Sequence, residues 1–410
     1  MLRYLIDMNF GAYLLYFKDD NKGNMTHFDW KKDTFYHDRY VSFIEELPFN
    51  SGYESCLLGE RFINIFKESK LINWLNTLYN ESQIVIGTGS APALCHALNW
   101  DLDIFKSHSG GIEYLGTPTI LNQSRPRLSY RWIKPYILRT YQKLGLIKNT
   151  KTVILTDFAS NKETLTKYRS DFHISLYPDY YKEITTGLIK LNINLHFNGF
   201  EESNINIIST CSQFWLKPQL YNYKQFHKQN KRNHWTLKAI YLLKKKYPTK
   251  PFMFWLLDSG KDVDKTKVLV RQYGLDKCVR FFKPIDRRYL SVYLSNFFAF
   301  IGEFTLEKNK VWGVSFMEAI LNGVPALQHV GFESSEFKRE FDHELPPHIN
   351  VSNANDIVSG ISSLIENPAY SRKLSKDALR WSKENYGSNI MRRWLDIVKR
   401  KQESGGGGRN

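Results

Sequence analysis

The sequence predicts an α/β protein built on parallel strands. Short apolar runs rich in β-branched and aromatic residues alternate with longer stretches of helical spacing along the chain. Several of these apolar runs end at a glycine turn or a polar residue, as strands of a parallel sheet do before a crossover helix. The chain has 410 residues, which is too long for one typical core, so we expect two domains.

The first half of the chain gives a partial pattern of strands and helices. The pattern predicts strands at 83–86, 103–106 and 152–156, and helices at 91–98 and around 162–168. Residues 1–80 contain no clear first strand followed by a glycine loop.

The second half alternates more regularly between the two kinds of element. We expect strands at 205–209, 252–257, 279–282, 297–301 and 325–330. We expect helices at 235–246, 266–273, 288–294, around Glu318, near 357–365 and at 371–386. This order is that of a doubly wound sheet with right-handed crossovers.

A polar link near residues 196–206 marks the expected domain boundary. The sequence therefore divides into an N-terminal domain at 1–203 and a C-terminal domain at 204–385. A final helix follows at 386–402, and the glycine-rich end at 403–410 is expected to be a flexible tail.

The composition favours an anionic partner and reducing conditions. The formal net charge is +16, which suits nucleic acid, an acidic membrane surface or a phosphorylated substrate. Four scattered cysteines (Cys56, Cys95, Cys211 and Cys278) form no metal-binding pattern, so we expect reduced thiols in a cytoplasmic protein. We expect neither a signal peptide nor a membrane span, because polar residues interrupt the N-terminus and every apolar run is short.

The segment from Trp312 to Leu327 carries the strongest functional pattern. A glycine turn leads into a short helix, Glu318 lies one turn inside it, and Gly323 and Pro325 end it. The first turn of a helix presents unpaired backbone N–H groups that can bind a diphosphate, and a carboxylate further in can accept hydrogen bonds from ribose hydroxyls. The alternative is an ordinary helix with Glu318 on its solvent-exposed face.

Four ordered segments of the second half resemble the nucleotide-binding domain of GT-B glycosyltransferases, most closely glycosyltransferase family 4. They are residues 230–240, 255–260, 279–284 and the stretch 318–325, which reads Glu-Ala-Ile-Leu-Asn-Gly-Val-Pro. The resemblance covers roughly residues 205–385. It implies two Rossmann-like domains facing across a cleft, with the acceptor on the N-terminal domain and the nucleotide-sugar on the C-terminal domain. It also implies retention at the anomeric carbon and a last helix, through Trp394 and Val398, that crosses back to the first domain.

The chain departs from the family pattern at two places. The family often has a glutamate eight positions before the second one, and here that position is Lys310. Glu303 with Phe304 is similar to an element that replaces this glutamate in some members. The arginine that the family places before its lysine is also missing, so Lys217, Lys231 or Arg232 would neutralise the phosphates.

The resemblance assigns roles to thirteen residues. The expected catalytic residues are His108, Lys231 and Glu318. The expected donor-binding residues are Arg232, Gly260, Pro284, Glu303, Gly313, Val314 and Ser315. The expected acceptor-side residues are Gly87, Gly89 and Ser90.

Each of these assignments has a plain structural alternative. Lys231 could belong to a solvated basic cluster, His108 could be structural, and Gly87 and Gly89 could form a simple turn. Near a strand end the sequence shows no Asp-x-Asp segment of the kind that holds a metal–diphosphate complex. We therefore expect no metal and no cofactor other than the UDP- or GDP-linked donor.

A segment at 125–148 mixes cations with aromatic residues, which suits an interfacial helix on an anionic membrane surface. The alternative is a surface helix with its aromatic residues turned inward, and Pro135 argues against a single long helix. Together with the resemblance, it suggests a retaining transferase on the inner face of the membrane. Such an enzyme would add sugar to a glycan or lipid-linked glycan of a surface polysaccharide. One alternative is a basic protein that binds nucleic acid or anionic membranes without catalysis, although no nucleic-acid-binding module is recognisable. Another is a different GT-B enzyme, such as a nucleotide-sugar epimerase.

Overall fold

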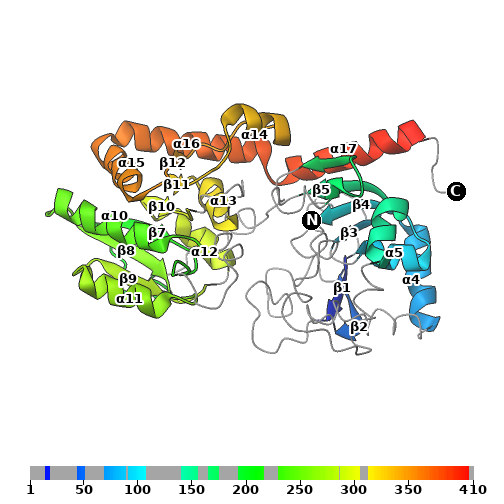
Figure 1. Ribbon diagram of the computed structural model, residues 1–410, viewed down its shortest axis with the longest axis horizontal. Helices are drawn as coiled ribbons and strands as arrows, with labels where there is room; N and C mark the ends of the chain where they lie inside the picture. Colours follow the sequence, from blue (N-terminus) through cyan, green and yellow to red (C-terminus); the bar gives the residue numbers. More distant parts are fainter. Residues whose placement is uncertain are drawn as a thin grey trace. The chain divides into compact units, whose positions relative to one another are not determined.

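The computed structural model describes residues 14–18, 44–50, 69–88, 91–107, 140–155, 165–174, 193–216, 230–285, 287–304 and 313–405. The chain divides into two compact units (Figure 1). Of the described residues, the first unit holds those up to Ile174 together with those from Ser388 onward, and the second unit holds 193–387.

The second unit is built on a six-stranded parallel sheet. Its spatial order is β12-β11-β10-β7-β8-β9, so the first strand in sequence lies in the middle. The strands are β7 (Ile205–Ser209), β8 (Phe252–Leu257), β9 (Val279–Phe282), β10 (Ala299–Ile301), β11 (Ala326–Gln328) and β12 (Ile349–Asn350). The helices are α10 (Asn233–Lys246), α11 (Val263–Gln272), α12 (Arg287–Leu294), α13 (Val314–Leu321), α14 (Ser334–Phe341), α15 (Ala354–Glu366) and α16 (Pro368–Asn385), and a 3-10 turn spans Ile193–Leu195.

Alternate residues of the central strands serve different cores. Ile207 and Phe254 join the apolar faces of α10, α11 and α15 in one large cluster. The neighbouring residue Trp255 instead meets Phe197, whose ring centroid lies 5.4 Å away. This alternation follows from the two-residue period of a strand, and burial on both faces explains why these strands are almost wholly apolar.

The first unit contains a four-stranded parallel sheet in the order β3-β4-β5-β6 and a separate two-stranded one. The four strands are β3 (Ile86–Thr88), β4 (Leu102–Ser107), β5 (Thr150–Leu155) and β6 (Phe172–Ile174), and the pair is β1 (Leu14–Lys18) and β2 (Ile44–Asn50). Its helices are α4 (Ser69–Glu81), α5 (Ala91–Leu98) and the C-terminal α17 (Ser388–Gly405), with a π-helical turn at Gly145–Asn149.

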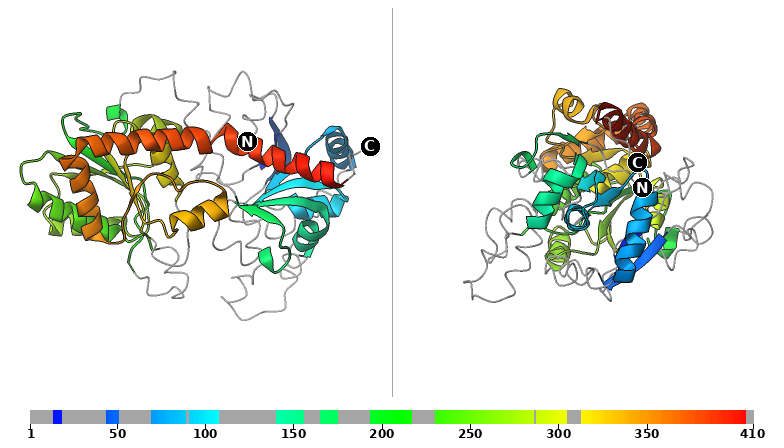
Figure 2. Two further views of the ribbon diagram at one scale, coloured as in Figure 1. Left: turned by 90° about the horizontal axis from the view of Figure 1, so that it is seen from above. Right: turned by 90° about the vertical axis from the view of Figure 1, so that its right-hand side faces the viewer.

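Helix α17 is attached to the sheet of the first unit, along which it lies in Figures 1 and 2. The Lys401 ammonium donates to the carbonyl of Lys151 at 2.8 Å and lies 3.6 Å from Asp171. The far end of the chain therefore completes the same unit as β5 and β6.

Several elements match the sequence pattern to the residue. They are α5, β7, β8 and β9. Helix α14, the short strand β12 and the elements β1, β2 and α4 of the first 81 residues were not predicted.

One expectation in the first unit is wrong. The sequence placed a strand at 83–86 with Gly87 in the turn after it, but β3 begins at Ile86 and includes Gly87. A Cβ atom on Gly87 would lie 2.4 Å from the Cβ of Ala91, so glycine here allows close packing of α5 on β3.

Candidate functional site

In the sheet of the second unit, the order in which successive strands are added reverses between β7 and β10. Strands β8 and β9 extend from β7 to one side, and β10, β11 and β12 extend to the other. Loops after two such strands separate at their carboxyl ends, which is where open α/β sheets bind ligands. Lys231, Glu303 and the amino end of α13 meet at this point, and together they are called the switch-point site below.

Backbone hydrogen bonds hold Lys231 between the two loops. Its N–H donates to the carbonyl of Phe214, in the segment after β7, at 2.7 Å. Its own carbonyl accepts from the N–H of Phe304, just after β10, at 3.4 Å. The backbone of Lys231 therefore links the segment after β7 to the segment after the adjacent strand β10.

The Glu303 carboxylate connects Lys231 to helix α13. Its Oε2 lies 2.9 Å from the Lys231 ammonium. Its Oε1 would lie 3.1 Å from a Cβ atom placed on Gly313, the N-cap residue of α13. The glycine therefore leaves room for an anionic group at the positive end of the helix.

The charges of this site follow from its partial burial. Burial, the largest single influence, lowers the pKa of Lys231, but the charge and hydrogen bond of Glu303 and the nearby Cys211 together outweigh it, so the pKa lies above its usual value. Burial raises the pKa of the neighbouring Cys211 thiol to about 12, so Cys211 stays neutral. The charged groups are thus the Lys231 ammonium and the Glu303 carboxylate.

Gln328 at the end of β11 fixes the backbone just after β10. Its side-chain oxygen accepts the N–H of Glu303 at 3.0 Å. A Cβ atom on Gly302 would lie only 1.7 Å from the same oxygen, so a side chain at 302 would prevent this contact. Gln328 therefore fixes the position of the backbone from which the Glu303 side chain extends.

Glu318 lies on α13, in the same helix as Gly313, Val314 and Ser315. It is 3% exposed, which excludes the alternative that it lies on a solvent-exposed face. A carboxylate this deeply buried needs hydrogen-bonding or charged partners.

Arg232 follows Lys231 in the left-handed conformation, with φ of 50°. Its N–H donates to the Asn230 side chain at 2.9 Å, and its guanidinium lies 4.9 Å from the ring centroid of Trp235. Burial is the main cause that lowers the pKa values of His234 and His329, and the charge of Arg232 lowers both further. Arg232 therefore acts on residues that follow β7 and on residues that follow β11.

A buried polar network that the sequence did not reveal shapes the loop after β7. Gln213 is 1% exposed, and its amide group donates to the carbonyls of Cys211 and Leu257 and accepts from Thr266. Asp262 accepts the backbone N–H groups of Trp215 and Leu216 at 2.7 and 3.0 Å. Asp262 is the N-cap residue of α11, but its side chain serves the loop after β7 and not the helix, so nothing in the sequence marks its role or that of Gln213.

Gly260 belongs to this network. Its φ is +117°, and a Cβ atom there would lie 2.3 Å from the carbonyl oxygen of Gln213. The glycine expected to bind donor therefore has an evident packing role, because it lets the loops after β7 and β8 touch.

The remaining expected residues lie elsewhere. Pro284 is exposed after β9, at the far edge of the sheet from the β7–β10 point, and Gly87 belongs to the first unit. His108, Gly89, Ser90, Lys217, Lys310 and most of the segment 125–148 lie outside the described residues.

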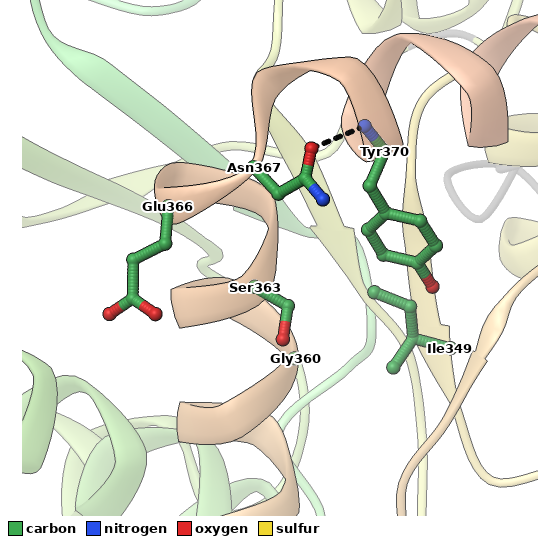
Figure 3. Close-up of a pocket in the computed structure, with 6 residues that line it drawn as sticks. All are labelled: Ile349, Gly360, Ser363, Glu366, Asn367 and Tyr370. Atoms are coloured by element: carbon green, nitrogen blue, oxygen red, sulfur yellow. Dashed lines mark hydrogen bonds between the residues drawn. The ribbon is translucent and has the colours of Figure 1, made fainter.

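A depression of about 400 Å³ on the second unit does not coincide with the switch-point site (Figure 3). It lies at the edge strand β12 and at the junction of α15 and α16. Asn367 caps α16 there by accepting the N–H of Tyr370 at 3.0 Å, and Glu366 pairs with Lys246 at 3.1 Å. These polar groups therefore stabilise the junction between α15 and α16.

The described part of the chain contains neither a cluster of metal ligands nor a membrane-spanning helix. No three or more His, Cys, Asp or Glu side chains in it come close enough to bind a metal ion together. None of its helices has the length and apolar character needed to cross a membrane. Asp101 and Asp103 do form an Asp-x-Asp pair, but it lies at the amino end of β4 and both carboxylates pair with Lys151.

The fold is similar to that of solved glycosyltransferases. Sucrose-phosphate synthase from Thermosynechococcus elongatus aligns over 98% of this chain and 92% of its own, with a TM-score of 0.55 and 12% identity. Anabaena HepE in complex with UDP aligns over 95% of this chain and 100% of its own, with a TM-score of 0.56 and 12% identity. No family model matches the chain, and no curated protein matches it in sequence. The predicted α/β fold of the GT-B class is confirmed by these similarities.

Replacing Gly260 by alanine should unfold the second unit more readily. The added methyl group would meet the Gln213 backbone at a φ that alanine avoids, so we expect a loss of at least about 3 kcal/mol. Gly274→Ala is the matched control, because Gly274 also has a positive φ but open space around it, and it should cost about 1 kcal/mol. Equal losses in urea unfolding would contradict the packing role of Gly260.

Acid should destabilise the second unit through three partly buried histidines. Burial holds the pKa values of His234, His329 and His348 below their usual value, so the unfolded chain takes up protons first as the pH falls. Stability is therefore complete above about pH 6.5 and decreases below it, by up to about 1.4 kcal/mol per pH unit for each histidine. Thermal unfolding at pH 7.5 and 5.5 measures this loss. His348→Gln should reduce it, and an unchanged acid loss in that variant would contradict the assignment.

Proposed function

We propose that this chain is a glycosyltransferase that moves a sugar from a nucleotide-sugar donor to a glycan acceptor. The observation that carries the proposal is the convergence of Lys231, Glu303 and the amino end of α13 at the switch point of the sheet. The GT-B fold alone does not define an activity, so the activity is inferred from this site.

In the proposed complex the donor diphosphate lies at the amino end of α13. The backbone N–H groups near Val314 and Ser315 bind its oxygens, and the Lys231 ammonium neutralises its charge. Glu318 accepts hydrogen bonds from the ribose. Arg232 adds positive charge at the same edge of the sheet.

These groups support glycosyl transfer by stabilising the leaving group. The bond between the anomeric carbon and the diphosphate oxygen breaks, and the acceptor oxygen forms the new bond. The leaving phosphate takes the proton of the acceptor hydroxyl, so the reaction needs no separate base and proceeds with retention. The fixed cation and helix dipole stabilise the developing charge at the phosphate without reorganising.

The finer assignment follows the sequence resemblance to glycosyltransferase family 4. The HepE structures, with UDP and with UDP and glucose, show that a protein of similar fold binds such ligands. We propose a UDP- or GDP-linked donor here. The proposed product is a surface polysaccharide or its lipid-linked precursor.

The acceptor is assigned to the N-terminal domain (1–203), with Gly87, Gly89, Ser90 and His108 near it. The donor is assigned to the C-terminal domain (204–385). The proposed location is cytoplasmic, on the inner face of an anionic membrane, because of the basic and aromatic segment 125–148.

A thermal-shift panel with UDP, GDP, ADP and CMP tests the proposal. One of the two expected diphosphates, UDP or GDP, should raise the melting temperature, because a ligand that binds only the folded state stabilises it. Lys231→Met should weaken the binding of that ligand by about 10- to 100-fold, since the variant loses charge-assisted hydrogen bonds of about 1.5–3 kcal/mol. Glu318→Gln should reduce the shift as well. Lys238→Met is the control, because this exposed lysine of α10 carries the same charge.

The outcomes separate the candidate functions. Binding of neither UDP nor GDP, with salt-sensitive binding of random oligonucleotides, would favour a nucleic-acid-binding protein. Interconversion of nucleotide-sugars without transfer would favour an epimerase.

Chelation should leave the activity intact. Because Lys231 and the α13 N-terminus are the proposed counter-charges of the diphosphate, turnover of the donor should stay within about twofold of its initial rate in EDTA. The rate measured with and without EDTA tests this. A loss that added Mg²⁺ or Mn²⁺ restores would contradict it.

A further inference from the structure

The Glu303 carboxylate occupies the position that the proposed function gives to the diphosphate. Its two oxygens face the two groups expected to bind phosphate: Oε2 lies 2.9 Å from the Lys231 ammonium, and Oε1 lies beside Gly313 at the N-cap of α13. It is thus an anion supplied by the chain itself, bound between a cation and a positive helix end.

The position of this carboxylate is set by the backbone around it. The N–H of Glu303 is fixed by Gln328, and the next residue, Phe304, bonds to the Lys231 carbonyl. The exposed fraction of the Glu303 side chain is 15% and that of Lys231 is 31%. Such a pair is screened less than a surface pair, so breaking it has a measurable cost.

A diphosphate cannot simply join the pair. The Lys231 ammonium has three N–H donors and could face two acceptors, but both acceptors here are anionic. A carboxylate and a phosphate held on one ammonium and one helix end repel each other at close range. Turning the carboxylate away from Lys231 relieves this repulsion.

We propose that Glu303 is an internal competitor of the donor diphosphate and thereby sets the affinity of the protein for its nucleotide. In the ligand-free protein the carboxylate neutralises Lys231. Donor binding moves it away, and the free energy needed to break the ion pair is subtracted from the binding free energy. This inference rests on the proposed diphosphate site and adds to it a residue whose removal strengthens binding.

The test is the dissociation constant of a nucleoside diphosphate without a sugar, measured by titration calorimetry on the full chain. UDP and GDP are the probes, and leaving out the sugar excludes any contact between Glu303 and the transferred group. Glu303→Gln keeps the shape of the side chain and should bind the preferred diphosphate about tenfold more tightly. Glu303→Ala should do the same and serves if the first variant is unstable. Glu366→Gln is the matched control, because Glu366 pairs with Lys246 outside the switch-point site, and it should bind as the wild type does.

Tighter binding by both Glu303 variants, with an unchanged Glu366 control, supports the inference. Equal or weaker binding by the Glu303 variants, while the wild type binds, overturns it and leaves the proposed function standing. A wild-type protein that binds neither UDP nor GDP overturns the proposed function, and the inference with it.

Discussion

The Lys231 ammonium and the Glu303 carboxylate lie 2.9 Å apart across the point where the sheet of the second unit changes direction. Most other features of the site depend on this contact. It joins the loop after β7 to the end of β10, and through Gly313 it reaches the start of α13. A partly buried charge needs a partner of opposite sign, so either the carboxylate or a ligand anion must occupy this place.

The rest of the unit keeps the two partners in position. Gln213 and Asp262 satisfy the backbone of the loop after β7, and Gln328 does so for the residue after β10. These side chains contact backbone groups that strands and helices leave unpaired, and they thereby hold the described residues of these loops in place. Gly260 and Gly302 are part of the same arrangement because a side chain at either would collide with it.

The sequence predicted the parts of the structure that depend on local patterns. Strands β7, β8 and β9 were found to the residue, because burial on both faces makes them continuous apolar runs. Strand β12 was missed because two residues carry no periodicity. Lys231 and Glu303 were each named from the family resemblance, but their pairing was not, since it depends on how distant segments meet at the sheet edge. Gln213 and Gln328 were missed because a buried glutamine looks like a surface one in sequence.

The most direct test of the site is a crystal structure of the full chain with UDP or GDP, whichever stabilises it. We expect the diphosphate between Lys231 and the backbone N–H groups at the start of α13, the ribose at Glu318, and the Glu303 carboxylate turned away from Lys231. A nucleotide bound elsewhere, with the Lys231–Glu303 pair intact, would contradict the account.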